Sequence, residues 1–168
     1  EFLEDAVDLL ALIRQGLKPN LLLMRTFSKI YGLAGLRLGY GIGNPELVAS
    51  LEKVRQPFNI NSLVQAGALA AIDDVEHIQR TRHNNAHGMA YLQTEVLRLG
   101  LQFVPSAANF LLVRVGDGQK TFNDLQKLGV ITRPMGGYGL PEFIRISVGT
   151  PAENARCIDS LRKVIGKA

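Results

Sequence analysis

The stretch MRTFSKIYGLAGLRLGYGIG, residues 24–43, places Lys29 directly after an apolar run and before a turn that contains glycines. The run LLLMRTF, residues 21–27, predicts a β-strand, and Gly32 and Gly35 predict a tight turn. A lysine in an apolar setting loses its charge more readily than a solvated one, because desolvation disfavours the ammonium form. Such a lysine can attack a carbonyl group. Taken alone, however, the position fits a surface lysine better.

The residues around Lys29 change that balance. Thr26 and Ser28 offer hydroxyl groups, and Arg37 offers a guanidinium fork suited to a phosphate dianion. A lysine for a carbonyl group, with an arginine and hydroxyl groups for a phosphate, matches pyridoxal 5'-phosphate, which carries both groups. The stretch therefore favours this cofactor.

The composition is that of a globular chain. Its 168 residues, 46% hydrophobic and 20% charged, can bury one good core or two small ones. The 19 Lys and Arg residues exceed the 15 Asp and Glu residues by four, but they are spread along the chain. This distribution argues against a dedicated nucleic-acid-binding arm and leaves room for a small anionic ligand. The stretch GLRLGYGIGNPE fails the G-x-G-x-x-G pattern, since Asn44 and Glu46 occupy its final position.

Three features bear on location. The longest uncharged stretch, residues 56–72, is short and interrupted by polar residues, so we expect no membrane span. The segment EFLEDAVDLL has no basic region typical of a signal peptide. The single cysteine, Cys157, excludes an intramolecular disulfide framework and fits a reducing compartment. We therefore expect a cytoplasmic protein.

The hydrophobic periodicity and the turn residues predict alternating helices and strands. Helices are expected over residues 2–15, 45–55, 61–74, 76–100, 119–129 and 151–166, and strands over residues 21–27, 37–43, 103–115, 130–135 and 143–150. Asn61 or Ser62 is the expected cap of the third helix. The pattern indicates part of an α/β unit, residues 1–75, followed by a small α+β domain, residues 76–168.

Two candidate sites are set aside. His83 and His87 stand four residues apart on a predicted helix, but no third ligand is near and the neighbouring Arg80 and Arg82 would repel a cation. We expect a solvated helix face and no metal site. Cys157, on an amphipathic helix, is expected to be a core residue rather than a nucleophile.

Two arginines differ from the others in context. Arg133 in GVITRPM and Arg145 in FIRISVGT each interrupt or end an apolar β-rich run, where a charge is costly unless it meets an anion. Either one alone could form a structural ion pair. Two such arginines in one small domain favour a shared anionic ligand.

Several segments together resemble a known family. RTFSKIYGLAGLRLGY is similar to the lysine segment of fold-type-I pyridoxal-phosphate enzymes. With RQPFNINSLVQAGALAA, ANFLLVRV, GVITRPM and FIRISVGTPAEN, the chain resembles the histidinol-phosphate aminotransferases over nearly its whole length. The implied fold class is α/β: residues 1–75 as the carboxyl-terminal part of the cofactor-binding large domain, then a small α+β domain with a long connecting helix.

The resemblance also implies site residues. Lys29 would carry the cofactor, with Thr26, Ser28 and Arg37 holding its phosphate. Arg145 matches the arginine that takes the substrate's anionic group, and Arg133 matches a second arginine that reaches the phosphate of histidinol phosphate. Asn109 and Asn59 fall on segments that face the site in the family.

The implied activity is transfer of an amino group between histidinol phosphate and 2-oxoglutarate or glutamate, in histidine biosynthesis. The implied partners are a phosphorylated amino alcohol, a dicarboxylate and a second copy of the chain in a homodimer, with no nucleic acid and no membrane.

The sequence departs from the family in what it lacks. The small-residue turn for the cofactor phosphate, the asparagine near the ring oxygen and the D-E-A-Y segment with its aspartate do not occur in it. The resemblance is to the carboxyl-terminal half of such an enzyme, and we expect the segment alone to be inactive. Two alternatives stay open: a threonine-phosphate decarboxylase of the same fold, and a truncated module without catalysis.

Overall fold

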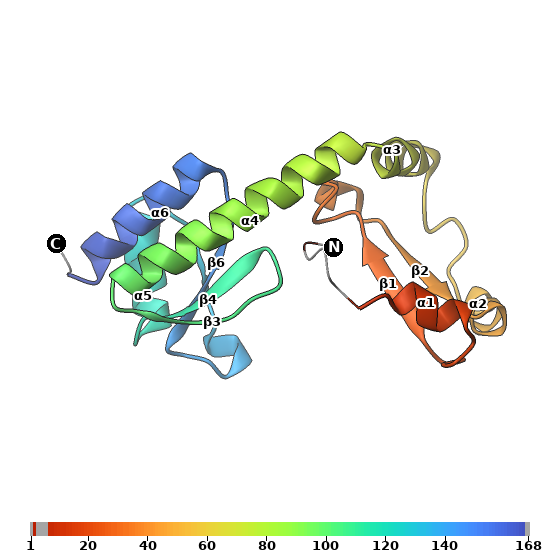
Figure 1. The fold of residues 1–168 in the computed structure, drawn as a ribbon, viewed down its shortest axis with the longest axis horizontal. Helices are drawn as coiled ribbons and strands as arrows, with labels where there is room; N and C mark the ends of the chain where they lie inside the picture. Colours follow the sequence, from red (N-terminus) through yellow and green to blue (C-terminus); the bar gives the residue numbers. More distant parts are fainter. Residues whose placement is uncertain (1, 3–6, 167–168) are drawn as a thin grey trace. The chain divides into compact units, whose positions relative to one another are not determined.

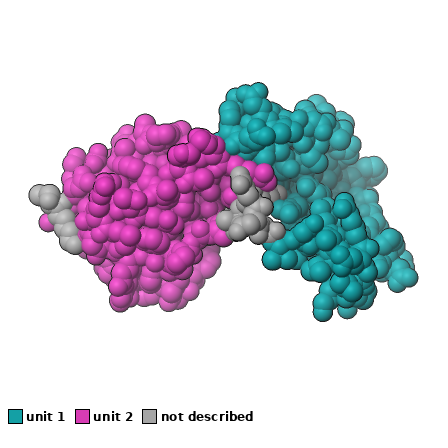
Figure 2. Space-filling view, viewed as in Figure 1, with its two compact units in different colours: residues 1, 3–80 teal, residues 2, 81–168 magenta. Residues whose placement is uncertain are grey.

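The computed structural model describes residue 2 and residues 7–166. These residues form two compact units, shown in Figure 2. The amino-terminal unit ends at Arg80 and the carboxyl-terminal unit begins at Thr81, apart from Phe2, which groups with the latter. The division therefore falls within a helix that begins at Val75.

The amino-terminal unit consists of short elements (Figure 1). They are α1 (Leu9–Arg14), β1 (Leu22–Thr26), the 3-10 turn η1 (Ala34–Leu36), β2 (Gly39–Gly43), α2 (Pro45–Glu52), α3 (Ser62–Ile72) and the start of α4 (Val75–Arg98). The first predicted helix, residues 2–15, forms only over Leu9–Arg14 among the described residues, and its residues 3–6 lie outside them. Asn61 caps α3, since its side chain accepts from the backbone N–H of Val64 at 3.0 Å.

The two strands of this unit pair antiparallel, from Leu22 opposite Gly43 to Thr26 opposite Gly39. Position 39 requires glycine, because a Cβ there would lie 2.7 Å from the carbonyl oxygen of Arg25. The buried hydrophobic residues are few among the described residues of this unit: Leu23, Phe27, Ile30 and Leu38.

The carboxyl-terminal unit holds a sheet covered by helices on one face (Figure 1). After α4 come β3 (Gln102–Val104), β4 (Phe110–Arg114), α5 (Gly118–Lys127), β5 (Arg133–Pro134), η2 (Gly136–Tyr138), β6 (Phe143–Ser147) and α6 (Pro151–Val164). The strands pair antiparallel in the order β3-β4-β6-β5. One sheet face joins side chains of α4, α5 and α6 in a core of Met89, Leu92, Val96, Leu99, Leu111, Val113, Leu125, Ile144, Ile146, Cys157, Ile158 and Leu161.

Two strand predictions were wrong in extent. The expected strand over residues 103–115 is instead two antiparallel strands, because Pro105 cannot donate to a ladder and Ser106 forms a turn by accepting from the N–H of Ala108 at 3.1 Å. The expected strand over residues 130–135 is paired only at Arg133 and Pro134. Proline is confined to such edge positions because it lacks the N–H group.

None of the helices described is long and apolar enough to span a membrane.

Candidate active site

Lys29 lies on a closed turn at the end of β1. The N–H of Phe27 donates to the carbonyl of Leu38 at 3.1 Å, and the N–H of Leu33 donates back to the carbonyl of Phe27 at 2.9 Å. Within this loop, the N–H of Gly32 donates to the carbonyl of Lys29 at 2.9 Å. Gly32 has a φ of 70°, a conformation that favours glycine. The tight turn predicted from the glycines is therefore confirmed.

Burial on both sides of Lys29 holds its backbone while its side chain stays exposed. Ile30 is 2% exposed and Phe27 is 4% exposed. The Phe27 ring packs 4.8 Å from the ring of Tyr31 and 5.6 Å from that of Tyr40, measured between centroids. The Lys29 amine is therefore accessible on a held backbone, and its exposure differs from the apolar setting expected from the sequence.

The other candidate cofactor residues lie close to Lys29 in the sequence, on the same loop. The N–H of Ser28 donates to the Thr26 hydroxyl at 3.0 Å, so both hydroxyl groups sit at the end of β1. Arg37 follows η1 with a φ of 53°, which is unusual for a residue other than glycine. Its exposed guanidinium donates through Nη1 to the carbonyl of Ala34 at 2.9 Å. Strained backbone of this kind concentrates at functional sites.

One neighbour of the turn was missed by the sequence analysis. The imidazole Nε2 of His77, in the first turns of α4, lies 3.2 Å from the carbonyl oxygen of Ile30. The two residues are 47 positions apart. No spacing in the sequence could have indicated this contact, because it depends on how α4 packs within the amino-terminal unit.

Arg133 and Arg145 lie directly opposite each other where β5 pairs with β6. Opposite residues of a strand pair project from the same face, and like charges in such a pair are destabilising. The Arg145 guanidinium lies 5.2 Å from the centre of the Phe110 ring, and its Nε is buried without a hydrogen-bond partner. An anion between the two guanidinium groups would relieve both costs.

The two asparagines occupy different settings. Asn109 directly precedes β4, and its carbonyl accepts from the N–H of Val148 at 2.9 Å. It thus lies beside the end of β6. Asn59 is exposed, and its side-chain oxygen accepts from Nη1 of Arg55 at 2.7 Å. The contact with Arg55 gives the Asn59 side chain a local role within its own loop.

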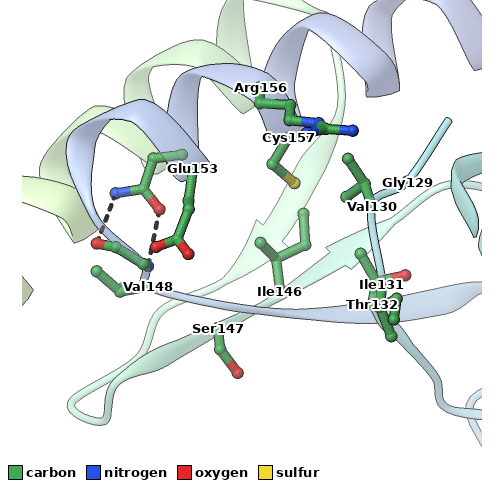
Figure 3. A pocket seen from close by; sticks show the side chains of 12 residues that line it. Gly129, Val130, Ile131, Thr132, Ile146, Ser147, Val148, Glu153, Arg156 and Cys157 are labelled. Atoms are coloured by element: carbon green, nitrogen blue, oxygen red, sulfur yellow. Dashed lines mark hydrogen bonds between the residues drawn. The ribbon is translucent and has the colours of Figure 1, made fainter.

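A cavity of about 390 Å³ lies between α6 and the segment 129–132 (Figure 3). None of the predicted site residues lines it. Two of its polar groups serve the start of α6: the Glu153 carboxylate accepts from the N–H and hydroxyl of Thr150, and the Asn154 amide exchanges hydrogen bonds with the backbone of Gly149. Cys157 also lines it, and burial raises the pKa of its thiol to about 11. The interpretation of Cys157 as a core residue is therefore confirmed.

The rings of the two histidines set aside above contact each other in a tilted arrangement, with 45° between their planes. The rings of His83 and His87 lie 4.0 Å apart between centroids, and Nδ1 of His87 contacts the carbonyl of His83 at 3.0 Å. Within the described residues, no three His, Cys, Asp or Glu side chains gather in a way that could hold a metal ion.

Comparison with known proteins identifies the class. A family model described as aminotransferase class I and II matches residues 2–161. The chain therefore belongs to the class I and II aminotransferase family.

Relatives within this family carry a more particular name. A histidinol-phosphate aminotransferase of Akkermansia muciniphila is 50% identical over 98% of this chain and 45% of its own length. Histidinol-phosphate aminotransferase 2 of Ralstonia nicotianae is 52% identical over 100% of this chain and 46% of its own length. The chain thus spans about half the length of the curated relatives it matches, and the predicted resemblance is confirmed.

A solved structure gives the same result for the fold. Histidinol-phosphate aminotransferase from Sinorhizobium meliloti, in complex with pyridoxal-5'-phosphate, matches with a TM-score of 0.81 and 32% identity. The match covers 89% of this chain and 42% of that protein. The fold class is confirmed as part of the fold-type-I large domain followed by a small α+β domain.

Proposed function

We propose that the protein containing this chain transfers an amino group between histidinol phosphate and 2-oxoglutarate or glutamate, with pyridoxal 5'-phosphate as cofactor. The observation that carries the proposal is the pair formed by Arg133 and Arg145. Two guanidinium groups on one sheet face, one of them with a buried nitrogen that lacks a partner, suit a phosphate or a carboxylate. Both classes of substrate in this reaction carry such a group.

The residues of the Lys29 turn fit the cofactor by their chemistry. The amine of Lys29 is exposed and suits the carbonyl group. The hydroxyl groups of Thr26 and Ser28 and the guanidinium of Arg37 suit the phosphate. The Arg37 side chain is exposed, which leaves its guanidinium accessible to an anion.

The chemistry of this chain's residues follows from these assignments. When bound, pyridoxal phosphate withdraws electrons from the substrate carbon that bears the amino group. Lys29 would hold the cofactor by its carbonyl group, and the Nζ of Lys29, when free, would take the proton from that carbon and later return a proton. Arg145 and Arg133 hold the substrate's anionic end, so that the carbon to be deprotonated is kept within reach of Nζ.

The proposal extends to the setting of the whole protein. We expect a cytoplasmic homodimer that acts on small molecules, and no role for nucleic acid or a membrane. The buried thiol of Cys157, the single cysteine of this chain, is consistent with a reducing compartment.

The test uses the full-length protein. After reduction of the loaded protein with borohydride and proteolysis, mass spectrometry should find the pyridoxyl group on Lys29, and a Lys29→Ala variant should carry none there. Incubation with histidinol phosphate and 2-oxoglutarate should yield glutamate. A pyridoxyl group on another lysine would contradict the site, and release of carbon dioxide without need of an oxo acid would favour a decarboxylase.

A further inference from the structure

We propose that His77 is a positioning residue for Lys29, holding the turn that presents the lysine amine. The inference rests on the proposed role of Lys29. Its structural basis is the hydrogen bond between the His77 imidazole and the backbone of Ile30, the residue that follows the lysine.

The geometry fixes the direction of this bond. Nε2 of His77 lies 3.2 Å from the Ile30 carbonyl oxygen, and a carbonyl oxygen only accepts, so Nε2 carries the proton. The imidazole also lies near Gly32, where an added Cβ would be 3.7 Å from Nε2. The ring therefore bonds to the turn at Ile30 and lies beside it at Gly32, on the carboxyl-terminal side of Lys29.

The His77 backbone is itself anchored. Its N–H donates to Oδ1 of Asp74 at 2.9 Å, and the N–H of Ile78 donates to the Asp74 carbonyl at 3.2 Å. These bonds begin α4, so the imidazole projects from a fixed first turn. The bond from His77 to Ile30 thus ties the turn to a regular helix.

The consequence for Lys29 follows from the covalent chain. The Ile30 carbonyl belongs to the planar peptide group that joins Ile30 to Tyr31, so a rotation there changes ψ of Ile30, the residue after Lys29, and can displace the turn that presents the lysine. The side chain of Ile30 is buried, which leaves its carbonyl in a partly buried setting where it needs a donor. Without His77, the turn would have to reorient to find another donor. Small displacements of a reacting group can cost a large factor in rate.

Three substitutions in the full-length protein separate the hydrogen bond from packing. His77→Phe keeps a ring but removes the donor. His77→Gln keeps an N–H near the position of Nε2. His83→Phe is the matched control, an exposed histidine on the same helix but in the carboxyl-terminal unit. If His77→Phe fails to fold, His77→Met replaces it, since methionine also lacks a donor.

Two measurements read the effect. Hydrogen exchange of peptides covering residues 27–33, in cofactor-free protein, should be about 2- to 12-fold faster in His77→Phe, the factor expected for one net hydrogen bond. In the loaded enzyme, kcat should fall about 10-fold while KM for 2-oxoglutarate stays within about 2-fold. His77→Gln should restore most of the slow exchange and most of kcat. His83→Phe should change neither the exchange rate nor kcat.

The outcomes are distinguishable. If His77→Phe behaves as His83→Phe does in both measurements, the positioning role is wrong. If His77→Gln is as impaired as His77→Phe, ring packing and not the hydrogen bond matters, and the inference is again wrong. If borohydride labels no pyridoxyl group at Lys29 in the unsubstituted protein, the proposed function fails, while the exchange data still decide whether His77 holds the turn.

Discussion

At the scale of single residues, the arginine pair of the carboxyl-terminal unit is the most informative. A guanidinium nitrogen buried without a partner, in a residue directly opposite a second arginine across a strand pair, lowers stability in the absence of a ligand. Such arrangements occur where the binding of a ligand offsets their cost in stability. The arginine pair therefore predicts a preference for substrates that carry an anionic group, as well as a high affinity for them.

We expect Arg133→Leu in the full-length enzyme to weaken histidinol phosphate far more than an unphosphorylated aromatic amino acid. A charge-assisted contact contributes about 1.5–3 kcal/mol, equivalent to roughly 10- to 150-fold in kcat/KM. The control is Arg114→Leu, because Arg114 lies on the same sheet face but is already paired with Glu142 at 2.8 Å. Equal losses for both substrates in Arg133→Leu would mean that Arg133 is structural.

The sequence predicted candidate site residues that lie in one local stretch, and it did not indicate His77, which contacts that stretch from a distant position. Lys29, Thr26, Ser28 and Arg37 share one short stretch, so their residue types could be interpreted together. His77 could not be found in this way, because its contact with the turn exists only after α4 has packed. Arg133 and Arg145 stood out by context, but the strand register that sets them opposite each other was not predictable.

At the scale of elements, the joint between α5 and β6 depends on one glycine. The N–H of Gly118, at the start of α5, donates to the Pro141 carbonyl at 2.9 Å. A Cβ at this position would lie 2.4 Å from the carbonyl oxygen of Phe143 and 2.8 Å from that of Pro141. Backbone atoms on both sides cannot move aside as a side chain can. The helix and the strand are thus held in direct backbone contact.

Gly118→Ala should therefore separate α5 from β6 and lower the local stability by about 1–3 kcal/mol, the usual range for overpacking. Hydrogen exchange of peptides from α5 and β6 in the full-length protein measures this loss. Gly137→Ala is the matched control, since nothing lies within 4 Å of a Cβ there. Similar exchange in the two variants would show that the joint tolerates a side chain.

Helices were predicted more accurately than strands, for a physical reason. The cap at Asn61 and the proline at Pro45 mark helix starts through bonds within a few residues. A strand ends where its partner ends, as at Pro134, or where the chain turns back, as between Val104 and Phe110. Those limits depend on partners distant in the sequence.

At the scale of the whole molecule, the two units differ in how much core they hold. Of the nine largest fully buried side chains among the described residues, only Ile30 belongs to the amino-terminal unit. Its helix α3 buries no residue, and Leu63 and Leu69 on it are 83% and 70% exposed. Hydrophobic burial is the main stabilising contribution to folding. The two units should therefore differ in independent stability.

We expect residues 81–168 expressed alone to unfold in one cooperative urea transition, and residues 1–80 expressed alone to show none. The eight other fully buried side chains form the core of residues 81–168. Burial of each contributes about 1.5–3 kcal/mol to the free energy of unfolding, before the loss of conformational entropy is subtracted. Circular dichroism against urea concentration is the measurement. A cooperative transition in residues 1–80, or its absence in residues 81–168, would contradict this expectation.

The position of α6 has a consequence for synthesis on the ribosome. Three core residues, Cys157, Ile158 and Leu161, come from this last helix, while the first, Met89, lies in α4. Translation at about 5–20 residues per second separates these ends by roughly 4–14 seconds. Until α6 leaves the ribosomal exit tunnel, the apolar face of the sheet that α6 packs against stays exposed to water, and chaperones can bind it. A stop codon shortly before α6 would then yield a nascent domain that proteolysis removes, although every candidate site residue had already been translated.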